Sequence, residues 1–442
     1  MGKLFGTDGI RGVANADLTP DLVLAVGRAA GYVLGAAGAD VVVGRDTRIS
    51  GPMLEGALVA GLCSAGANVR TIGILPTPGI AFLTVDSGAA GGAVVSASHN
   101  PVPDNGVKFF SPSGMKVTTT LEDQIEELLS DPRTDLPRGE GVGTVTPLAD
   151  GTERYLEHLS GTLPRKLDGL KVALDCAYGA AWDVAPRAFK EAGADVVAIN
   201  NAPDGTRINV DCGSTSLQAL SRLVVEKGAD VGFAFDGDAD RVLACDEHGR
   251  QIDGDRIIAL CAISLHDGGA LKGDVVVVTV MTNLGFRRAL EARGIEVIAA
   301  PVGDRHVAEA MLDRGAVLGG EQSGHVIFSD HATTGDGVLT GLQVAAAIKD
   351  SGTPLSATGS LFEEVPQVLL NVRVAHRERL EEATELWEEV ARAEESLGED
   401  GRVLLRPSGT EPLVRVMVEA VAPGRAEKVA SDLASLVEKH LS

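Results

Sequence analysis

Three stretches of the chain repeat one order of hydrophobic and polar positions. Each begins with a run of β-branched residues, continues through a polar loop and a helical stretch, and ends with a second β-branched run. This order predicts a βαβ crossover, in which a helix capped by a glycine returns the chain to the next parallel strand. The stretches are residues 40–74, 170–200 and 273–303, and the glycines are Gly66, Gly193 and Gly294.

The spacing of these stretches indicates that the repeated unit is a whole domain. They start more than 100 residues apart, which is too far for the stacked repeats of a solenoid. Polar or Pro/Gly-rich segments lie between them, as expected at domain boundaries. We therefore predict three similar α/β domains, at residues 1–150, 151–250 and 251–363.

The pattern changes after about residue 366. Residues 368–374 and 413–421 predict strands, whereas residues 376–397 and the last residues of the chain predict amphipathic helices. This segment is not a fourth copy of the βαβ pattern. We predict a smaller α+β domain at residues 364–442.

Composition and charge narrow the class of protein. The 442 residues are 44% hydrophobic and only 3% aromatic, which favours an α/β enzyme over an aromatic-rich nucleic-acid platform. A formal net charge of −23 opposes general binding to nucleic acid or to anionic membranes, so an anionic substrate needs a local basic pocket. Five cysteines without a CxxC pair, no signal peptide and no long apolar run indicate a cytoplasmic protein.

The segment "GGAVVSASHNPVPDNGVKFFS" places Ser98 and His99 directly after a predicted strand. A hydrolase serine normally lies in a GxSxG turn, and its histidine comes from a distant part of the chain. Neighbouring side chains of an extended segment point to opposite faces, so this pair should not form a catalytic dyad. Taken alone, Ser98 is more readily explained as a turn residue.

The segment "VGFAFDGDADRVLACD" contains a candidate metal site. Asp236, Asp238 and Asp240 follow an apolar strand, and carboxylates at this spacing can converge on one hard cation. An EF-hand would need glycine where Arg241 stands and a helix before the loop, so we reject that alternative. Because three carboxylates leave Mg²⁺ short of six ligands, phosphate oxygens and water would complete its coordination, although a solvated acidic turn remains the simpler alternative.

Three further motifs are less specific when each is taken by itself. "RPSGTEPLVR" at 406–415 is suited to holding a phosphate, but a hairpin turn with surface arginines fits equally well. In "GGEQSGH" at 319–325, alternating polar residues can face one side of an extended segment, although an incidental polar loop is the more common explanation. "FGTDGIRG" allows the backbone to pass close to a ligand beside Arg11, or forms a flexible turn.

Together, "FGTDGIRG", "SASHNP", "DGDADR", "GEQSGH" and "RPSGTEP" resemble the α-D-phosphohexomutase superfamily, in the family's order and over the whole chain. The resemblance implies three similar α/β domains with mixed sheets sandwiched by helices, and a smaller fourth domain, around a central cleft. The glutamine in "GEQSGH" and the "FGTDGIRG" start point to the branch that acts on glucosamine phosphates. One departure is His306, where the family pattern has tyrosine, and no chemical role falls on that position.

The resemblance also implies roles for individual residues. Ser98 matches the phosphoserine, and its oxygen joins Asp236, Asp238 and Asp240 as ligands of one Mg²⁺ per subunit. Matches to electrostatic or proton-transfer positions are Arg11, Lys108 and His325. Matches to substrate-binding positions are Arg241, Glu321, Ser323, Arg406, Ser408, Gly409, Thr410 and Arg415.

The implied activity is the interconversion of glucosamine 6-phosphate and glucosamine 1-phosphate, with glucosamine 1,6-bisphosphate as intermediate or activator. Such an isomerase supplies UDP-N-acetylglucosamine for cell-wall synthesis. The phosphorylated amino sugar is then the expected partner, and a homodimer is an option because relatives are often dimers. Alternatives are a phosphomannomutase or phosphoglucomutase with the same chemistry, and a non-catalytic regulator that binds phosphosugars. The retained Ser98, Lys108 and three aspartates oppose the regulator.

Overall fold

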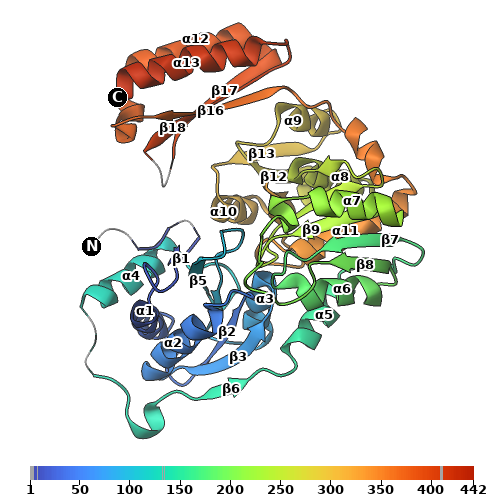
Figure 1. The fold of residues 1–442 in the computed structure, drawn as a ribbon. Helices are drawn as coiled ribbons and strands as arrows, with labels where there is room; N and C mark the ends of the chain where they lie inside the picture. Colours follow the sequence, from blue (N-terminus) through green and yellow to red (C-terminus); the bar gives the residue numbers. More distant parts are fainter. Residues whose placement is uncertain (1–3, 7, 132, 134, 409–411) are drawn as a thin grey trace. The chain divides into compact units, whose positions relative to one another are not determined.

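A computed structural model describes residues 4–6, 8–131, 133, 135–408 and 412–442. Contacts divide the chain into two compact units, which are described separately. The larger unit comprises Met1–Thr279 and Ile298–Thr358, and the C-terminal unit comprises Val280–Val297 and Gly359–Ser442. Figure 1 labels their helices and strands along the chain. The short 3-10 turns are η1 Gly139–Gly141, η2 Gly213–Thr215, η3 Lys272–Asp274, η4 Leu355–Ser360, η5 Arg377–Glu382 and η6 Gly398–Asp400.

The first α/β layer of the larger unit is a six-stranded sheet in the order β1-β5-β4-β2-β3-β6. Its strands are β1 Ile10–Val13, β2 Asp40–Arg45, β3 Asn68–Ile74, β4 Gly91–Val95, β5 Asp104–Phe110 and β6 Val145–Pro147. The β4-β2-β3-β6 part is parallel, whereas β1 and β5 are antiparallel additions at one edge. The helices are α1 Pro20–Val33, α2 Gly51–Ser64, α3 Thr77–Asp86 and α4 Thr119–Ser130.

Strand β2 shows why this sheet is covered on both faces. Val41 and Val43 belong to a core cluster with residues of α1 and α2, and Val42, which points to the opposite face, is also fully buried. Helix α3 contacts β2 and β4, while α1 and α2 pack against each other. A continuous β-branched run is typical of a parallel strand buried on both sides. The mixed sheet between helices confirms the fold predicted from the sequence.

The second sheet has the order β11-β10-β9-β7-β8. Strands β7, β8 and β9 are parallel, and β10 and β11 are antiparallel. Its elements are β7 Lys171–Asp175, β8 Asp195–Ile199, β9 Val231–Phe235, β10 Val242–Asp246, β11 Gln251–Ile252, α5 Gly151–Gly161, α6 Ala181–Glu191 and α7 Gln218–Lys227. Gly193 has a φ of +98°, and its N–H bonds to Lys190 O at the end of α6. This left-handed turn is the one predicted from the glycine.

The third sheet has the order β13-β12-β14-β15. Its elements are β12 Val275–Thr279, β13 Glu296–Ala300, β14 Leu318–Gly320, β15 Val326–Phe328, α8 Gly254–Asp267, α9 Leu284–Glu291, α10 Asp304–Arg314 and α11 Gly337–Ser351. Helix α9 occupies the place predicted between two strands, but by its contacts it belongs to the C-terminal unit. There, Asn283 before α9 donates to Val365 O and to Glu419 Oε1, at 3.0 and 3.1 Å.

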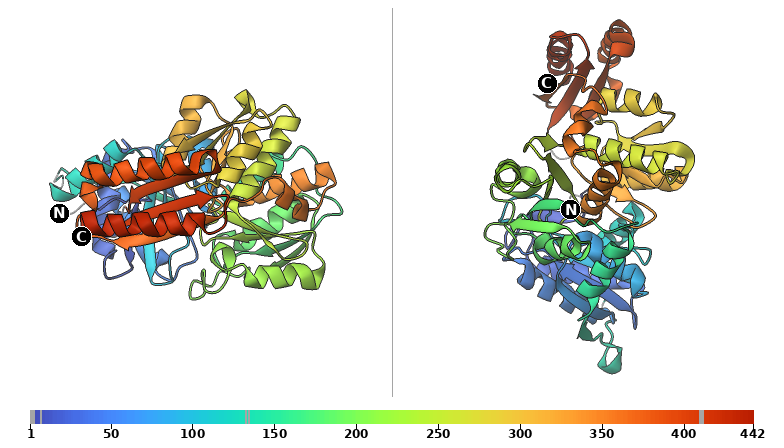
Figure 2. Two further views of the ribbon diagram at one scale, coloured as in Figure 1. Left: turned by 90° about the horizontal axis from the view of Figure 1, so that it is seen from above. Right: turned by 90° about the vertical axis from the view of Figure 1, so that its right-hand side faces the viewer.

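The C-terminal unit contains an antiparallel sheet in the order β16-β18-β17. Its elements are β16 Gln367–Arg373, β17 Gly401–Pro407, β18 Leu413–Ala420, α12 Thr384–Leu397 and α13 Arg425–Leu441. The two helices lie together on one face of this sheet (Figures 1 and 2). The helix predicted at 376–397 is shorter than expected, because residues 377–382 form a 3-10 turn that buries Leu380. The amphipathic pattern could not separate the two, since i to i+3 and i to i+4 spacings overlap.

No helix within the described parts of the chain combines the length and the apolar character needed to cross a membrane.

Candidate active site

Ser98 lies in the loop between β4 and β5 and is 1% exposed. Its φ is +50°, in the left-handed region that residues other than glycine seldom adopt. Ser98 Oγ lies 2.5 Å from Asp236 Oδ2 and 3.3 Å from His99 Nδ1. The prediction that Ser98 and His99 point apart was therefore wrong, because it assumed an extended segment. Asp236, rather than His99, is the closer partner of the hydroxyl group.

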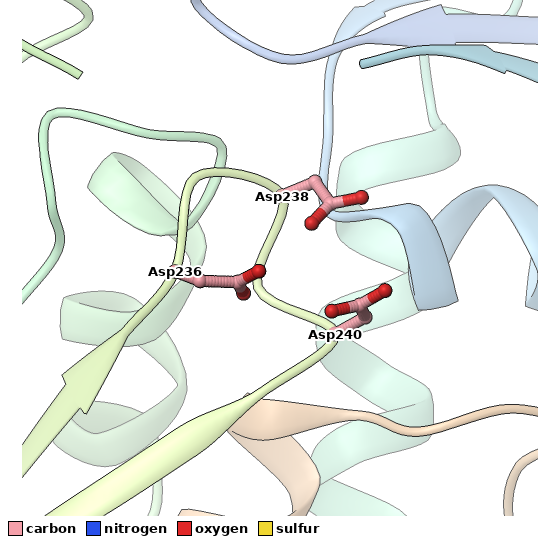
Figure 3. A group of neighbouring side chains, drawn as sticks. All are labelled: Asp236, Asp238 and Asp240. Carbon is pink, nitrogen blue, oxygen red and sulfur yellow. The ribbon is translucent and has the colours of Figure 1, made fainter. Parts of the chain in front are cut away.

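The three aspartates occupy one tight loop between strands β9 and β10. Each offers a carboxylate oxygen, and these oxygens lie within 4.8 Å of one another. The carboxyl groups extend into the same region beside the loop (Figure 3). The backbone of Gly237 approaches the serine loop so closely that an added Cβ would lie 2.5 Å from Ser98 O. The backbones of the serine loop and the aspartate loop, more than 130 residues apart in sequence, are thus in direct contact.

Lys108 of β5 supplies the positive charge closest to the aspartates. Its Nζ donates to Asp238 Oδ2 at 3.0 Å and to Asp240 Oδ2 at 3.3 Å. Thr77 Oγ1 also donates to Asp238 Oδ2, at 2.7 Å. Burial opposes the charged form of Lys108, but Asp238 and Asp240 outweigh that effect and raise its pKa. Lys108 is therefore an ammonium ion at neutral pH.

The acidic groups of the loop differ in protonation behaviour. Burial raises the pKa of Asp236 well above its usual range, and the charges of Asp240 and Asp238 raise it further. Burial would also raise the pKa of Asp240, but the positive charge of Lys108 dominates and holds it low. Adding a positive charge beside Asp236 would therefore favour its ionised form.

The carboxylate oxygens fit the requirements of a hard cation. Asp238 Oδ1 and Asp240 Oδ1 are buried, and neither makes a hydrogen bond to the described residues. Buried oxygens without hydrogen bonds are costly unless a cation or water binds them. An oxygen-only ligand set of this kind is suited to Mg²⁺.

Arg241 and His99 border the aspartate loop. The N–H of Arg241 donates to Asp236 Oδ1 at 3.2 Å, and its guanidinium lies 3.8 Å from Asp240 Oδ1. Burial lowers the pKa of His99 to about 4, and the charges of Arg241 and Arg11 contribute to this. The imidazole beside Ser98 Oγ is therefore neutral at pH 7.

A second charged network links Arg11 to His325. Arg11 bonds to Asp8 Oδ2 and Asn100 Oδ1, each at 3.1 Å, and Lys116 bridges Asp8 and Asp304. His325 is 2% exposed, and its Nε2 lies 3.5 Å from Asp304 Oδ2. Sequence reasoning missed Lys116 and Asp304. Asp304 lies in the "VGDRHV" segment, which carried no assigned chemistry, and only the fold brings Lys116 beside it.

The "GEQSGH" segment forms a turn, so its polar residues do not share one face as predicted. The N–H of Glu321 bonds to His325 O at 2.9 Å and closes the turn between β14 and β15. Ser323 Oγ donates to Glu321 Oε2 at 3.3 Å, whereas the His325 ring turns toward Asp304. Glu321 and Ser323 remain a pair, and His325 belongs to the Lys116 network.

The hairpin of the C-terminal unit brings two arginines together. Arg406 on β17 and Arg415 on β18 are directly opposed in the antiparallel register. Like charges at directly opposed positions repel each other, and an anion bound between them would reduce that repulsion. Ser408 lies directly after β17, in the connection to β18, and is 4% exposed. Gly409 and Thr410, which were predicted to complete the phosphate loop, lie outside the described residues.

Comparison with protein families gives the class of the chain. Models of the phosphoglucomutase/phosphomannomutase family match it in four consecutive segments. They are α/β/α domain I at residues 2–134, domain II at 153–249, domain III at 253–365 and the C-terminal domain at 369–436. The chain belongs to this family of phosphohexomutases, which are isomerases. The family membership, enzyme class and fold predicted from the five motifs are confirmed.

Individual relatives narrow the class. The chain is 53% identical to the phosphoglucosamine mutase of Streptomyces coelicolor, and equally so to that of Streptomyces griseus, over 451 aligned positions that cover all of each protein. It also resembles the crystal structure of a phosphoglucomutase/phosphomannomutase family protein from Burkholderia thailandensis. That likeness has a TM-score of 0.83 at 27% identity and covers 98% of this chain and 97% of the other. The branch indicated by "GEQSGH" and "FGTDGIRG" agrees with the names of the Streptomyces relatives.

Proposed function

We propose that the chain interconverts glucosamine 6-phosphate and glucosamine 1-phosphate, with Ser98 carrying the transferred phosphoryl group. One observation carries this proposal: the Ser98 hydroxyl lies 2.5 Å from Asp236, within a buried group of three carboxylates and beside Lys108. The phosphoglucosamine mutase names of the full-length relatives support the choice of sugar. Phosphoryl transfer depends mainly on positioning and charge neutralisation, which this cluster is suited to provide.

The reaction requires two transfers in opposite directions. In the first, the bond between phosphorus and Ser98 Oγ breaks, and the 1-hydroxyl oxygen of glucosamine 6-phosphate bonds to phosphorus. The sugar hydroxyl gives up its proton and the serine oxygen gains one, so that glucosamine 1,6-bisphosphate and free Ser98 are formed. In the second, the bond between phosphorus and the 6-oxygen breaks and Ser98 Oγ bonds to phosphorus. The serine hydroxyl gives up its proton and the 6-oxygen gains one, so that glucosamine 1-phosphate is released. The bisphosphate has to turn end for end between the two steps.

The charged residues around Ser98 suit particular tasks in these transfers. Lys108 is held as an ammonium ion with a raised pKa, so it is suited to stabilising negative charge and is a poor base. Arg241 and Arg11 add positive charge close to the loop. His325 Nε2 accepts a hydrogen bond from the N–H of Gly335 at 3.3 Å, so the neutral ring carries its proton on the buried Nδ1, and His325 is a candidate for electrostatic support or proton transfer.

Asp236, Asp238 and Asp240, together with an oxygen of phosphorylated Ser98, would hold one Mg²⁺ per subunit. Bound there, Mg²⁺ supplies charge neutralisation for the phosphoryl group. The buried oxygens Asp238 Oδ1 and Asp240 Oδ1 support this assignment. Asp236 is also the acceptor of the Ser98 hydroxyl proton in the unmodified protein.

The remaining predicted residues serve to hold the sugar and its second phosphate. Glu321 and Ser323, paired on the β14–β15 turn, would bind sugar hydroxyl or amino groups. Arg406, Ser408, Gly409, Thr410 and Arg415 would bind the phosphate that is not reacting. The opposed positions of Arg406 and Arg415 support this role, because a bound phosphate would relieve their repulsion.

The setting of the enzyme follows from the same reasoning. We place domain boundaries at residues 1–150, 151–250, 251–363 and 364–442, in line with the family segments. Five buried thiols support a cytoplasmic location. The product would supply UDP-N-acetylglucosamine for cell-wall synthesis, and a homodimer is the assembly to test first.

Initial rates on three sugar phosphates test the proposal. Glucosamine 6-phosphate should give a kcat/KM well above those of mannose 6-phosphate and glucose 6-phosphate, measured with Mg²⁺ and a trace of sugar bisphosphate. Omitting Mg²⁺ should abolish turnover of all three. A higher kcat/KM on either neutral sugar would identify a phosphomannomutase or phosphoglucomutase instead.

A further inference from the structure

We infer that the buried ion pair of Arg48 and Asp46 is a positioning device, which fixes the peptide groups on both sides of Ser98 and thereby sets the rate of phosphoryl transfer. The inference rests on the proposed function of Ser98. Both residues follow strand β2 in the segment "GRDTRIS", and neither side chain has any exposed surface. Arg48 Nε lies 3.0 Å from Asp46 Oδ2.

Arg48 binds the carbonyl groups of the serine loop. Its two terminal nitrogens donate to four backbone oxygens, which together span the loop from its serine to the start of β5. The acceptors are Ser98 O at 2.9 Å, Asn100 O at 2.7 Å, Pro101 O at 2.5 Å and Asp104 O at 2.9 Å. A planar guanidinium can satisfy several carbonyl groups at once, which the single ammonium of lysine cannot do in the same geometry.

Asp46 reaches the other side of Ser98 through one intermediate. Ser96 Oγ donates to Asp46 Oδ2 at 2.6 Å and accepts from the N–H of Ser98 at 2.9 Å. The carbonyl of Ser98 is bound directly by Arg48. Because the N–H and the C=O of Ser98 are both held by one ion pair, the φ and ψ of this residue are constrained from both sides.

This constraint matters because Ser98 has an unfavourable backbone conformation. A non-glycine residue in the left-handed region is strained and persists only where its surroundings impose that conformation. The second α/β domain also contributes, since Asn209 Nδ2 donates to Ser98 O at 2.9 Å. The left-handed turn is what directs Oγ toward Asp236, 138 positions along the chain.

A positioning role and a merely structural role predict different kinetics. A displaced serine should slow the transfer step, and a displacement of about 1 Å can cost on the order of 10²-fold in rate. Sugar binding should be affected little, because none of the proposed sugar-binding residues contacts Arg48, Asp46 or Ser96 among the interactions described above. The expected signature is therefore a lower kcat with an unchanged KM.

Ser96→Ala is the mildest variant that tests this, because it cuts the link to the Ser98 N–H and leaves the Arg48–Asp46 pair in place. Ser64→Ala is its matched control. Ser64 lies in the same domain, and its hydroxyl likewise makes two hydrogen bonds, donating to Gly61 O and accepting from Arg28 Nε. We expect Ser96→Ala to lower kcat and the single-turnover transfer rate about tenfold or more at unchanged KM, and Ser64→Ala to leave both unchanged.

Arg48→Lys provides a second, stronger variant that retains the charge beside Asp46. It should lower the transfer rate more than Ser96→Ala does, again without raising KM. Equal kcat in wild type, Ser96→Ala and Ser64→Ala would overturn the inference, as would a rise in KM at constant kcat. Phosphopeptide mapping of the wild type separates this from failure of the proposed function: if active wild type carries no phosphate on Ser98, the function and the inference both fall.

Discussion

The aspartate loop and the C-terminal hairpin both concentrate charge, but they do so in opposite ways. In the larger unit, three buried carboxylates are interleaved with Lys108 and Arg241, so that unlike charges meet. In the C-terminal unit, Arg406 and Arg415 are placed opposite each other on paired strands, so that like charges meet. The first arrangement is suited to binding a cation, and the second is suited to binding an anion.

This difference indicates a division of labour between chemistry and binding. The site around the aspartate loop is assembled from residues 77, 98, 108 and 236–240, which lie on separate buried segments. The hairpin takes its arginines from two adjacent strands. We therefore expect changes at the first site to act mainly on kcat, and changes at the second to act mainly on KM.

Replacing the serine should have the largest effect. Ser98→Ala removes the oxygen proposed to carry the phosphoryl group, so kcat should fall on the order of 10⁶-fold, as for other deleted nucleophiles. Thermal unfolding should change little, because a buried hydroxyl is lost without adding bulk. Ser113→Ala, at an exposed serine that follows β5, serves as the control and should retain full activity. Substantial turnover by Ser98→Ala would exclude Ser98 as the carrier of the phosphoryl group.

Asp238→Asn should rank second. The change removes one negative charge from the proposed cation site and weakens the ion pair between Asp238 and Lys108. We therefore expect kcat to fall roughly 10²–10³-fold and the Mg²⁺ concentration for half-maximal rate to rise. Titration of activity with Mg²⁺ measures both effects. Asp230→Asn, at an exposed aspartate just before β9, should leave the titration curve unchanged. An unaltered Mg²⁺ requirement in Asp238→Asn would remove the metal from this loop.

Arg406→Leu, in the C-terminal hairpin, should affect binding of the substrate rather than the chemical step. Loss of a charged hydrogen-bond donor to phosphate costs about 1.5–3 kcal/mol, which corresponds to a rise in KM of roughly 10–100-fold at nearly constant kcat. Arg392→Leu on the exposed face of α12 is the control. A fall in kcat at unchanged KM would show that the hairpin acts on the chemical step and not on substrate binding.

The smallest effect concerns a buried carboxylate that belongs to neither site. Burial raises the pKa of Asp336 to about 6, where it accepts from Tyr155 OH at 2.6 Å and caps α11. Between its ordinary pKa and about 6, folded Asp336 binds more protons than the unfolded chain, so its contribution to stability falls as pH rises through this window. Two pKa units correspond to at most about 3 kcal/mol.

Asp336→Asn should therefore flatten the loss of stability between about pH 4 and 6, as followed by urea unfolding of variant and wild type. The amide still offers an oxygen to Tyr155 and to the helix N-terminus, so the fold should persist. Parallel pH profiles for the two proteins would mean that Asp336 is not protonated near pH 6.

The sequence predicted the architecture because its signals are local. The β-branched runs, the glycines after helices and the five motifs each lie within a few residues, and the sheets follow from them. The helix at 376–397 was predicted too long because the 3-10 turn at residues 377–382 forms where Leu380 enters a core built by distant strands. The membership of α9 in the C-terminal unit likewise depends on contacts across 82 to 136 residues.

The sequence pointed to candidate site residues that lie in compact motifs, and it missed residues that stand alone in the chain. Ser98 and the three aspartates lie in compact motifs, and the structure brings them together. The contact of Ser98 with His99 was excluded on the assumption of an extended backbone, which a φ of +50° invalidates. Arg48 and Lys116 have no local signal, since each acts on loops that only the folded chain brings near.

Locating the phosphate on the active protein tests the central claim most directly. The intact mass of purified enzyme is compared before and after phosphatase treatment, and the modified peptide is then mapped. We expect one phosphate within residues 91–108, on Ser98, with activity that phosphatase removes and glucosamine 1,6-bisphosphate restores. Full activity in protein that carries no phosphate on Ser98, both before and during turnover, would contradict it.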